Sequence, residues 1–276
     1  IKIPRDFYSS EAYASKMIEY LDQTKDSGKP FFAYLAFTAP HWPLQAPEED
    51  IKKYEGKYDG GYDQLRSQRL AALKAKGIVP PDATHDAGNP LWPKWEKLSS
   101  EEKRSESKRM AVYAAMIDNM DRQIGCVLRY IEQQGELDNT FVFFMSDNGA
   151  DGNSVYDVAR NREWIEKSMD NSITNIGRPG SFIEYGPGWA QVSSTPLRMY
   201  KSFTYEGGIT GAAIAWGPKL GIKQAISHGV IDVKDVAPTI YELTGAKQPG
   251  TEYQGKSVTP VTGRSMLTYL QGKQPE

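Results

Sequence analysis

Apolar residues are arranged in two ways along this chain. Residues 31–37, 140–145 and 211–216 are apolar at nearly every position, a pattern that favours strands covered on both faces of a parallel sheet. Apolar residues recur at helical spacing over residues 10–21 and 232–244, which predicts amphipathic helices. The chain therefore combines predicted helices with predicted buried strands.

The most clearly predicted helix begins after Ser99. Ser99 and Glu102 fit a capping box, in which each side chain satisfies a backbone N–H of the first turn. Gly135 is placed to end the helix. One apolar stripe runs along it, formed by Met110, Tyr113, Ile117, Met120, Ile124, Val127 and Ile131. The strand over residues 140–145 follows, and this helix–turn–strand order predicts a crossover connection between parallel strands.

These elements predict an α/β fold with a mostly parallel sheet and helices on both of its faces. We expect the 276 residues to lie within a single domain, because that length can bury a large core. Residues 44–98 and 150–195 have no clean period. We interpret them as excursions along the rim of the domain, the first containing short helices.

Composition narrows the range of partners. The net charge is −2, so no large field favours a nucleic-acid partner, whereas a small anionic substrate remains compatible with it. The single cysteine, Cys126, excludes an intrachain disulfide. No apolar run approaches the roughly 20 residues that span a bilayer, so we expect no membrane partner. No pattern encodes the oligomeric state or the localisation; for a bacterial protein, cytoplasm and periplasm both stay open.

Polar side chains follow two of the predicted strands. His41 comes after the first, and Asp147 and Asn148 follow the second. Ligand sites in open α/β sheets lie outside the carboxyl ends of the strands, so these groups would converge if the strands are neighbours. Oxygen ligands such as Asp and Asn suit Ca²⁺ or Mg²⁺ better than Zn²⁺. A tight turn at Asn148-Gly149 accounts for the same sequence equally well. His41 and Lys201, each taken alone, are ordinary loop and surface residues.

Six ordered segments together resemble the sulfatase family, and bacterial arylsulfatases in particular, within the alkaline-phosphatase-like superfamily. The most specific of them is the strand that ends in Ser146-Asp147-Asn148-Gly149. The others are residues 30–35 running into Ala39-Pro40-His41-Trp42-Pro43-Leu44, residues 113–121, residues 135–140, residues 200–203 with Lys201 together with residues 206–209, and Asp235-Val236-Ala237-Pro238-Thr239.

This resemblance implies hydrolysis of sulfate monoesters by a formylglycine nucleophile and a bound Ca²⁺. It implies that Asp147 and Asn148 are calcium ligands, that His41 contacts the sulfate and assists the leaving oxygen, and that Lys201 contacts the ester region. Such roles are chemically sensible, because a cation and aimed donors stabilise the charge that develops on the sulfuryl oxygens.

The nucleophile is expected to lie outside these residues. The formylglycine forms from Cys or Ser followed by x-Pro-x-Arg, and Cys126 is followed instead by Val127-Leu128-Arg129. We therefore expect residues 1–276 to be the central part of one sulfatase catalytic domain, incomplete at both ends and inactive alone. Two alternatives stay open: a phosphonate or phosphodiester hydrolase of the same superfamily, which Asn148 disfavours, and a non-catalytic fragment.

Overall fold

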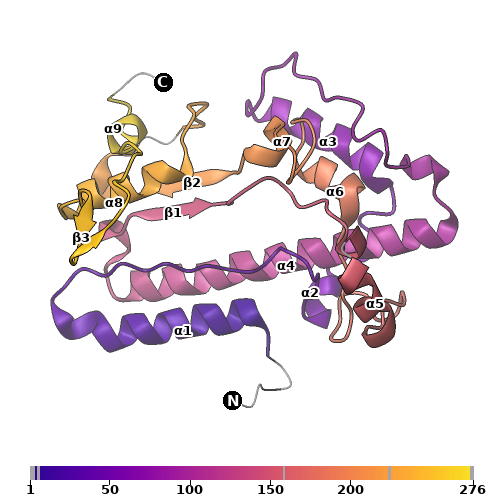
Figure 1. The fold of residues 1–276 in the computed structure, drawn as a ribbon, viewed down its shortest axis with the longest axis horizontal. Helices are drawn as coiled ribbons and strands as arrows, with labels where there is room; N and C mark the ends of the chain where they lie inside the picture. Colours follow the sequence, from indigo (N-terminus) through magenta and orange to yellow (C-terminus); the bar gives the residue numbers. More distant parts are fainter. Residues whose placement is uncertain (1–3, 5–6, 158, 223–224, 274–276) are drawn as a thin grey trace. The chain divides into compact units, whose positions relative to one another are not determined.

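The computed structural model describes residue 4 and residues 7–157, 159–222 and 225–273 (Figure 1). The chain divides into two compact units, which are described separately. The first contains residues 1–134 and 148–210, and the second contains residues 135–147 and 211–276. No helix in the described ranges has both the length and the apolar character needed to cross a membrane.

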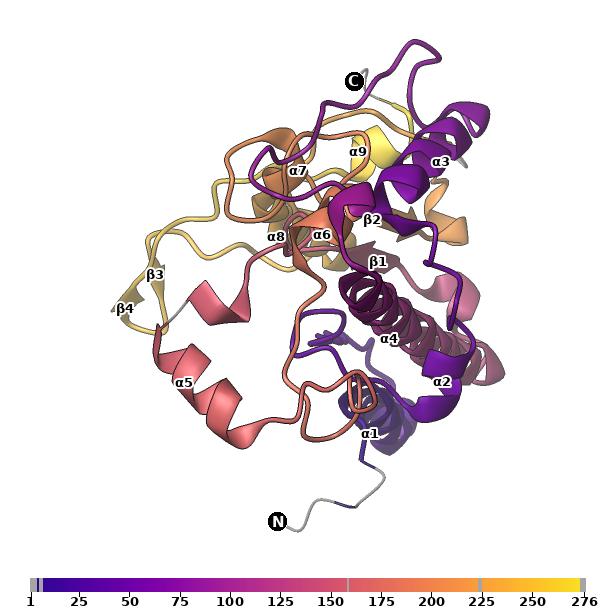
Figure 2. The ribbon, with the colours of Figure 1, turned by 90° about the vertical axis from the view of Figure 1, so that its right-hand side faces the viewer.

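The first unit is helical. Its helices are α1 (Ser9–Thr24), α2 (Glu48–Lys52), α3 (Gly61–Ala75), α4 (Ser100–Gln133), α5 (Ala159–Ser168), α6 (Gly186–Ser193) and α7 (Glu206–Ile209). α1 lies alongside α4, as both views show (Figures 1 and 2). The predictions for α1 and α4 are confirmed. Both hydrogen bonds of the Ser99–Glu102 capping box are present, and Gly135 follows α4 with a left-handed φ of 74°.

The core of this unit surrounds Trp189 on α6, which is fully buried. The Tyr62 and Trp95 rings meet the Trp189 ring edge-on, with centroids 5.6 and 5.8 Å away. The Trp189 indole N–H donates to the carbonyl of Glu106 on α4 at 3.0 Å. Buried aromatic clusters of this kind contribute both apolar area and favourable ring geometry. They fix the part of the chain between residues 44 and 98 against α4 and α6.

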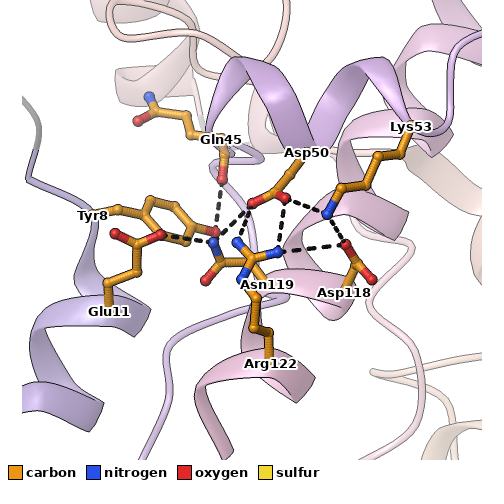
Figure 3. Close-up of polar contacts among 8 residues, drawn as sticks. All are labelled: Tyr8, Glu11, Gln45, Asp50, Lys53, Asp118, Asn119 and Arg122. Carbon is orange, nitrogen blue, oxygen red and sulfur yellow. Dashed lines mark hydrogen bonds and ion pairs between the residues drawn. The ribbon is translucent and has the colours of Figure 1, made fainter. Parts of the chain in front are cut away.

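A buried ion cluster joins α1, α2 and α4 (Figure 3). Asp50 on α2 is 0 % exposed. Arg122 donates to both of its carboxylate oxygens, at 2.9 and 2.8 Å. Lys53 and Asn119 donate to the same carboxylate at 2.8 and 2.9 Å, and Asn119 also reaches Glu11 of α1 at 3.0 Å. Burial would raise the pKa of Asp50, but these hydrogen bonds outweigh it and hold the pKa well below its ordinary value.

The second unit contains the described strands. They are β1 (Val142–Met145), β2 (Ala213–Trp216), β3 (Glu252–Tyr253) and β4 (Lys256–Ser257), with helices α8 (Val236–Thr244) and α9 (Leu267–Leu270). β1 and β2 occupy two of the predicted strand regions, and α8 occupies the last predicted helix. α8 ends as predicted at Gly245, which is left-handed.

Two predictions about the sheet are wrong. β1 pairs with β2 in the antiparallel sense, with Val142 opposite Trp216 and Met145 opposite Ala213, and β3 and β4 are antiparallel as well. An apolar run indicates a strand but not its direction, which depends on the connection. The predicted burial is not observed either, since Phe144 and Ile214 are 36 % and 64 % exposed. The mixture of helices and small sheets agrees with an α/β class, and the described strands do not form a parallel sheet.

The predicted strand over residues 31–37 is the second correction. This segment is not assigned to any sheet among the described residues, and Phe32 and Tyr34 are 72 % and 81 % exposed. A β-prone sequence becomes a strand only when another backbone satisfies its N–H and C=O groups. The segment still leads directly to His41.

Candidate functional site

His41 lies in a turn whose backbone is held by hydrogen bonds and by buried neighbours on both sides, Ala39 and Leu44. The His41 N–H donates to the Thr38 carbonyl at 3.0 Å, which closes the turn. Three residues later, buried Leu44 donates its N–H to the carbonyl of Ile183 at 2.9 Å. This fixed base leaves the imidazole 44 % exposed. The loop therefore presents the ring of His41 to solvent while its backbone is held by the core of the first unit.

Lys201 is positioned by close contact between backbones. Its N–H donates to the carbonyl of Ala150 at 2.8 Å, and the Gly149 N–H donates to the carbonyl of Gly208 at 3.0 Å. A Cβ on Gly149 would collide with the carbonyl of Gly207, and a Cβ on Gly207 would collide with the carbonyl of Met199. The three segments that contain Gly149, Lys201 and Gly207 are thus packed main chain against main chain, and only glycine fits.

Asp151 brings the two predicted cationic side chains together. Its Oδ2 lies 3.0 Å from Nε2 of His41 and 3.2 Å from Nζ of Lys201. Nε2 and Nζ are 3.2 Å apart. The Asp151 side chain is 11 % exposed, compared with 29 % for Lys201. Residues from three distant parts of the sequence therefore meet within hydrogen-bond distance at a partly exposed position.

The neighbours of His41 determine its protonation. Nδ1 lies 2.7 Å from the carbonyl oxygen of Trp42, which can only accept, so Nδ1 carries a hydrogen. Nε2 is then the nitrogen that gains or loses a proton. The hydrogen bond to Asp151 raises the pKa of His41 above its ordinary value, while partial burial and the charge of Lys201 oppose this. Asp151 in turn has a pKa held well below the usual range, because hydrogen bonds from His41, Asn153 and Lys201 outweigh its burial.

Asp147 and Asn148 follow directly after β1 and Ser146. The chain passes from the second unit to the first between them. The Asp147 side chain is exposed, and no hydrogen bond or ion pair to its carboxylate is found within the described ranges. Asn148 donates from Nδ2 to the carbonyl of Gly149 at 2.9 Å, which identifies the other end of the carboxamide as oxygen.

These two residues fit a hard cation only in part. They provide an uncommitted carboxylate and a carboxamide, which are the oxygen donors that Ca²⁺ prefers. Ca²⁺ takes about 6–8 oxygen ligands. In the part of the chain that the structure describes, no group of three or more His, Cys, Asp or Glu is placed to hold a metal ion. The pair is chemically suitable as part of a calcium site and needs further oxygens.

One segment does match the spacing of the nucleophile motif, contrary to the expectation that this motif lies outside residues 1–276. Ser194-Thr195-Pro196-Leu197-Arg198 has the spacing Ser-x-Pro-x-Arg. Ser194 is 8 % exposed, and its hydroxyl donates to the buried carbonyl of Gly207 at 3.3 Å. The segment leads from α6 to the loop that contains Lys201. A side chain covered in this way is not available to attack a substrate, so the match reflects spacing alone.

Asp151 is the site residue that the sequence did not reveal. It lies three positions after Asn148 in a run of small and polar residues, where an acidic residue is usually solvated. Its only local signal is Asn153, which donates to Asp151 Oδ1 from its backbone N at 3.0 Å and from Nδ2 at 2.7 Å. Such local turns are common at Asp residues, so the pattern does not distinguish a site from a loop.

Comparison with known proteins identifies the family to which the chain belongs. A family model described as Sulfatase matches residues 2–246. The chain is 43 % identical over 268 residues to an arylsulfatase of Klebsiella aerogenes, covering 96 % of this chain and 57 % of that protein. It is 42 % identical over 268 residues to a Schizosaccharomyces pombe protein named only as an uncharacterized sulfatase, covering 96 % of this chain and 48 % of that one.

The fold agrees with this assignment. The crystal structure of Ps i-CgsB superposes with a TM-score of 0.55 and 21 % identity, covering 99 % of this chain and 40 % of that chain. The crystal structure of the putative sulfatase yidJ of Bacteroides fragilis superposes with a TM-score of 0.57 and 19 % identity, covering 99 % of this chain and 44 % of that chain. This chain belongs to the sulfatase family. It spans about half the length of the curated relatives it matches.

Proposed function

We propose that this chain serves in the hydrolysis of sulfate monoesters, as an arylsulfatase-like enzyme. The observation that carries the proposal is the meeting of His41 Nε2 and Lys201 Nζ, 3.2 Å apart, at a partly exposed position. The 43 % identity to an arylsulfatase supports it. Two nitrogen donors this close can act on adjacent oxygens of one tetrahedral anion.

His41 is proposed as the proton donor to the leaving oxygen. As the bond between sulfur and the bridging oxygen breaks, its electron pair stays with oxygen. The proton moves from Nε2 to that oxygen. The imidazolium becomes a neutral imidazole whose Nδ1–H still donates to the carbonyl of Trp42. A well-placed general acid contributes about 10²–10⁴ in rate. The raised pKa of His41 keeps the donor form populated.

Lys201 is proposed as the fixed cation beside the ester. It neutralises charge that builds on the sulfuryl oxygens, and it does so without giving up its proton. Its backbone is fixed by the bond from its N–H to Ala150 at 2.8 Å, so its ammonium group needs little reorganisation during the reaction. Removing one such donor costs about 10²–10³ in rate.

Asp147 and Asn148 are proposed as two of the ligands of a Ca²⁺ ion. When bound, the ion would hold sulfate oxygens, and a formylglycine made from Cys or Ser would supply the nucleophile. We propose that this residue and the remaining oxygen ligands come from parts of the longer protein outside residues 1–276. Of the described residues, the exposed Asp147 carboxylate and the Asn148 carboxamide would hold the ion.

The test uses the full-length protein with Ca²⁺, and an aryl sulfate measured against the matching aryl phosphate. Preference for the sulfate is expected. Preference for the phosphate would move the protein to the phosphonate or phosphodiester hydrolases, and no turnover of either would favour a non-catalytic role. Lys167→Met, which alters an exposed lysine on α5, should keep the parent rate.

The two donors can be separated by varying the leaving group. His41→Ala should lose more activity toward alkyl sulfates than toward nitrophenyl sulfates, because a good leaving group needs less protonation. Lys201→Met should lose a similar factor toward both, because its charge acts on the sulfuryl oxygens. An equal loss for both esters in His41→Ala would contradict the general-acid role of His41.

A further inference from the structure

We propose that Asp151 is a positioning residue, which holds His41 and Lys201 together and keeps the proton on Nε2 of His41. The proposal rests on the proposed function, in which His41 donates that proton and Lys201 supplies a fixed charge. Asp151 contacts Nε2 of His41 and Nζ of Lys201. In this proposal it has no contact with the sulfate ester and acts on the reaction only through those two side chains.

The first argument is electrostatic. Protonated His41 and Lys201 are both cations, and their nitrogens are 3.2 Å apart. Like charges at that separation repel strongly where side chains are partly shielded from water. Asp151 Oδ2 lies within 3.2 Å of both nitrogens, so one carboxylate compensates two cations. Without it, the pair would separate or His41 would lose its proton.

The second argument is that the carboxylate is itself held in place. Its other oxygen, Oδ1, accepts two hydrogen bonds from Asn153, at 3.0 Å from the backbone N and 2.7 Å from Nδ2. Asn153 Nδ2 also donates to the hydroxyl of Ser202 at 3.0 Å. Ser202 is next to Lys201 in the chain, so Asn153 connects the loop that contains Asp151 to the loop that contains Lys201. This support leaves Oδ2 directed at the two cations.

The third argument concerns the proton. The carbonyl of Trp42, 2.7 Å from Nδ1, fixes a hydrogen there, and titration therefore takes place at Nε2. Asp151 and Lys201 are the charged groups that face the ring within the described residues. Asp151 favours the protonated ring and Lys201 disfavours it. Replacing Asp151 by the neutral, isosteric Asn leaves Lys201 unopposed, so the ring should lose its proton at lower pH.

The decisive experiment is an NMR titration of the histidine side chains in the full protein, with His41→Gln used to assign the His41 signal. In Asp151→Asn the midpoint of His41 should fall by about one pH unit or more. Asp151→Glu, which restores a carboxylate, should recover part of the shift. Asp157→Asn removes an exposed carboxylate six positions along the chain and should leave the midpoint where it is. An unchanged midpoint in Asp151→Asn would overturn the proposal.

Rates provide the second readout. In Asp151→Asn the alkaline limb of the pH–rate profile should move to lower pH, so that the loss in kcat approaches about 10-fold for each pH unit of the shift on the alkaline side and shrinks on the acid side. A loss that is equal at every pH would indicate a merely structural role and overturn the proposal. If Asp151→Asn does not fold, Asn153→Ala tests the same support and should give a smaller shift of the same sign.

The two proposals fail in different ways. A shifted His41 midpoint in a protein that hydrolyses no sulfate ester would support the coupling to Asp151 and contradict the proposed function. Sulfatase activity together with an unshifted midpoint would do the reverse. The titration therefore tests Asp151 without assuming the activity.

Discussion

The buried cluster around Asp50 leads to a prediction about which partner of an ion pair matters more. Asp50 is 0 % exposed, whereas the side chains of Arg122 and Lys53 are 40 % and 47 % exposed. If Asp50 loses its charge, both cations can turn to water. If Arg122 is removed, the carboxylate stays buried with fewer donors. Arg122→Met should therefore destabilise the protein more than Asp50→Asn.

The hydrogen bonds of Asp50 determine how much stability each variant should lose. Arg122→Met removes two charge-assisted hydrogen bonds of 2.9 and 2.8 Å. Breaking a buried pair in this way costs about 3–5 kcal/mol, and we expect about 3 kcal/mol because Lys53 and Asn119 still donate. Asp50→Asn keeps the shape of the side chain and should cost about 1–2 kcal/mol. The double variant should be more stable than the sum of the two losses predicts.

The pH dependence provides a sharper test. In the parent the folded pKa of Asp50 is depressed, so its contribution to stability is present at neutral pH and falls as pH drops toward that pKa. Arg122→Met removes the largest of the hydrogen bonds that lower the pKa of Asp50, so the folded pKa is depressed less than in the parent. The variant therefore loses less stability than the parent as pH falls. The difference in free energy of unfolding between parent and variant should therefore narrow in acid.

Urea unfolding followed by tryptophan fluorescence measures these differences. Arg178→Met is the matched control, because Arg178 makes two bonds of 2.7 Å to Glu48 but both side chains are more than a third exposed. It should cost less than about 1 kcal/mol. Equal losses for Arg122→Met and Arg178→Met, independent of pH, would refute the argument from burial.

Three further predictions concern other parts of the chain. Burial, opposed by Arg109, raises the pKa of Glu106 to about 7. The folded state therefore keeps this proton to a higher pH than the unfolded state does. The free energy of unfolding should fall by up to about 3 kcal/mol as pH rises from the unfolded pKa through 7. Glu106→Gln should remove that dependence in urea unfolding. Gly207→Ala, whose Cβ would meet the carbonyl of Met199, should lower Tm in thermal melts and reduce activity. Asp147→Ala should abolish any rise of Tm on adding Ca²⁺ to the full protein, as calorimetry would show.

Sequence patterns predicted the helices because the signals of a helix are local. The capping box at Ser99 and the stripe along α4 act within a few residues of one another, and the structure has both. Strand pairing is a relation between distant segments. The apolar runs that form β1 and β2 were identified. The apolar pattern encodes neither their antiparallel direction nor the fact that residues 31–37 join no sheet among the described residues.

The site shows the same limit. His41 and Lys201 stood out only through resemblance to a family, and the structure places them 3.2 Å apart. No sequence pattern distinguishes Asp151, since an acidic residue in a polar loop is ordinary. Its importance arises from the folding of three loops onto one another. The roles of His41, Lys201, Asp147 and Asn148 stay predictions until the variants are measured.

The main-chain packing of Gly149 against Gly207 has a consequence for how the site could be changed. Hydrogen bonds between backbones and the close approach of these glycines hold the main chain of Lys201 in place. Arg198, Phe203 and Tyr205 project from the same loop and are at least a third exposed. Laboratory evolution could therefore exchange these outward residues to suit new leaving groups while the lysine keeps its position.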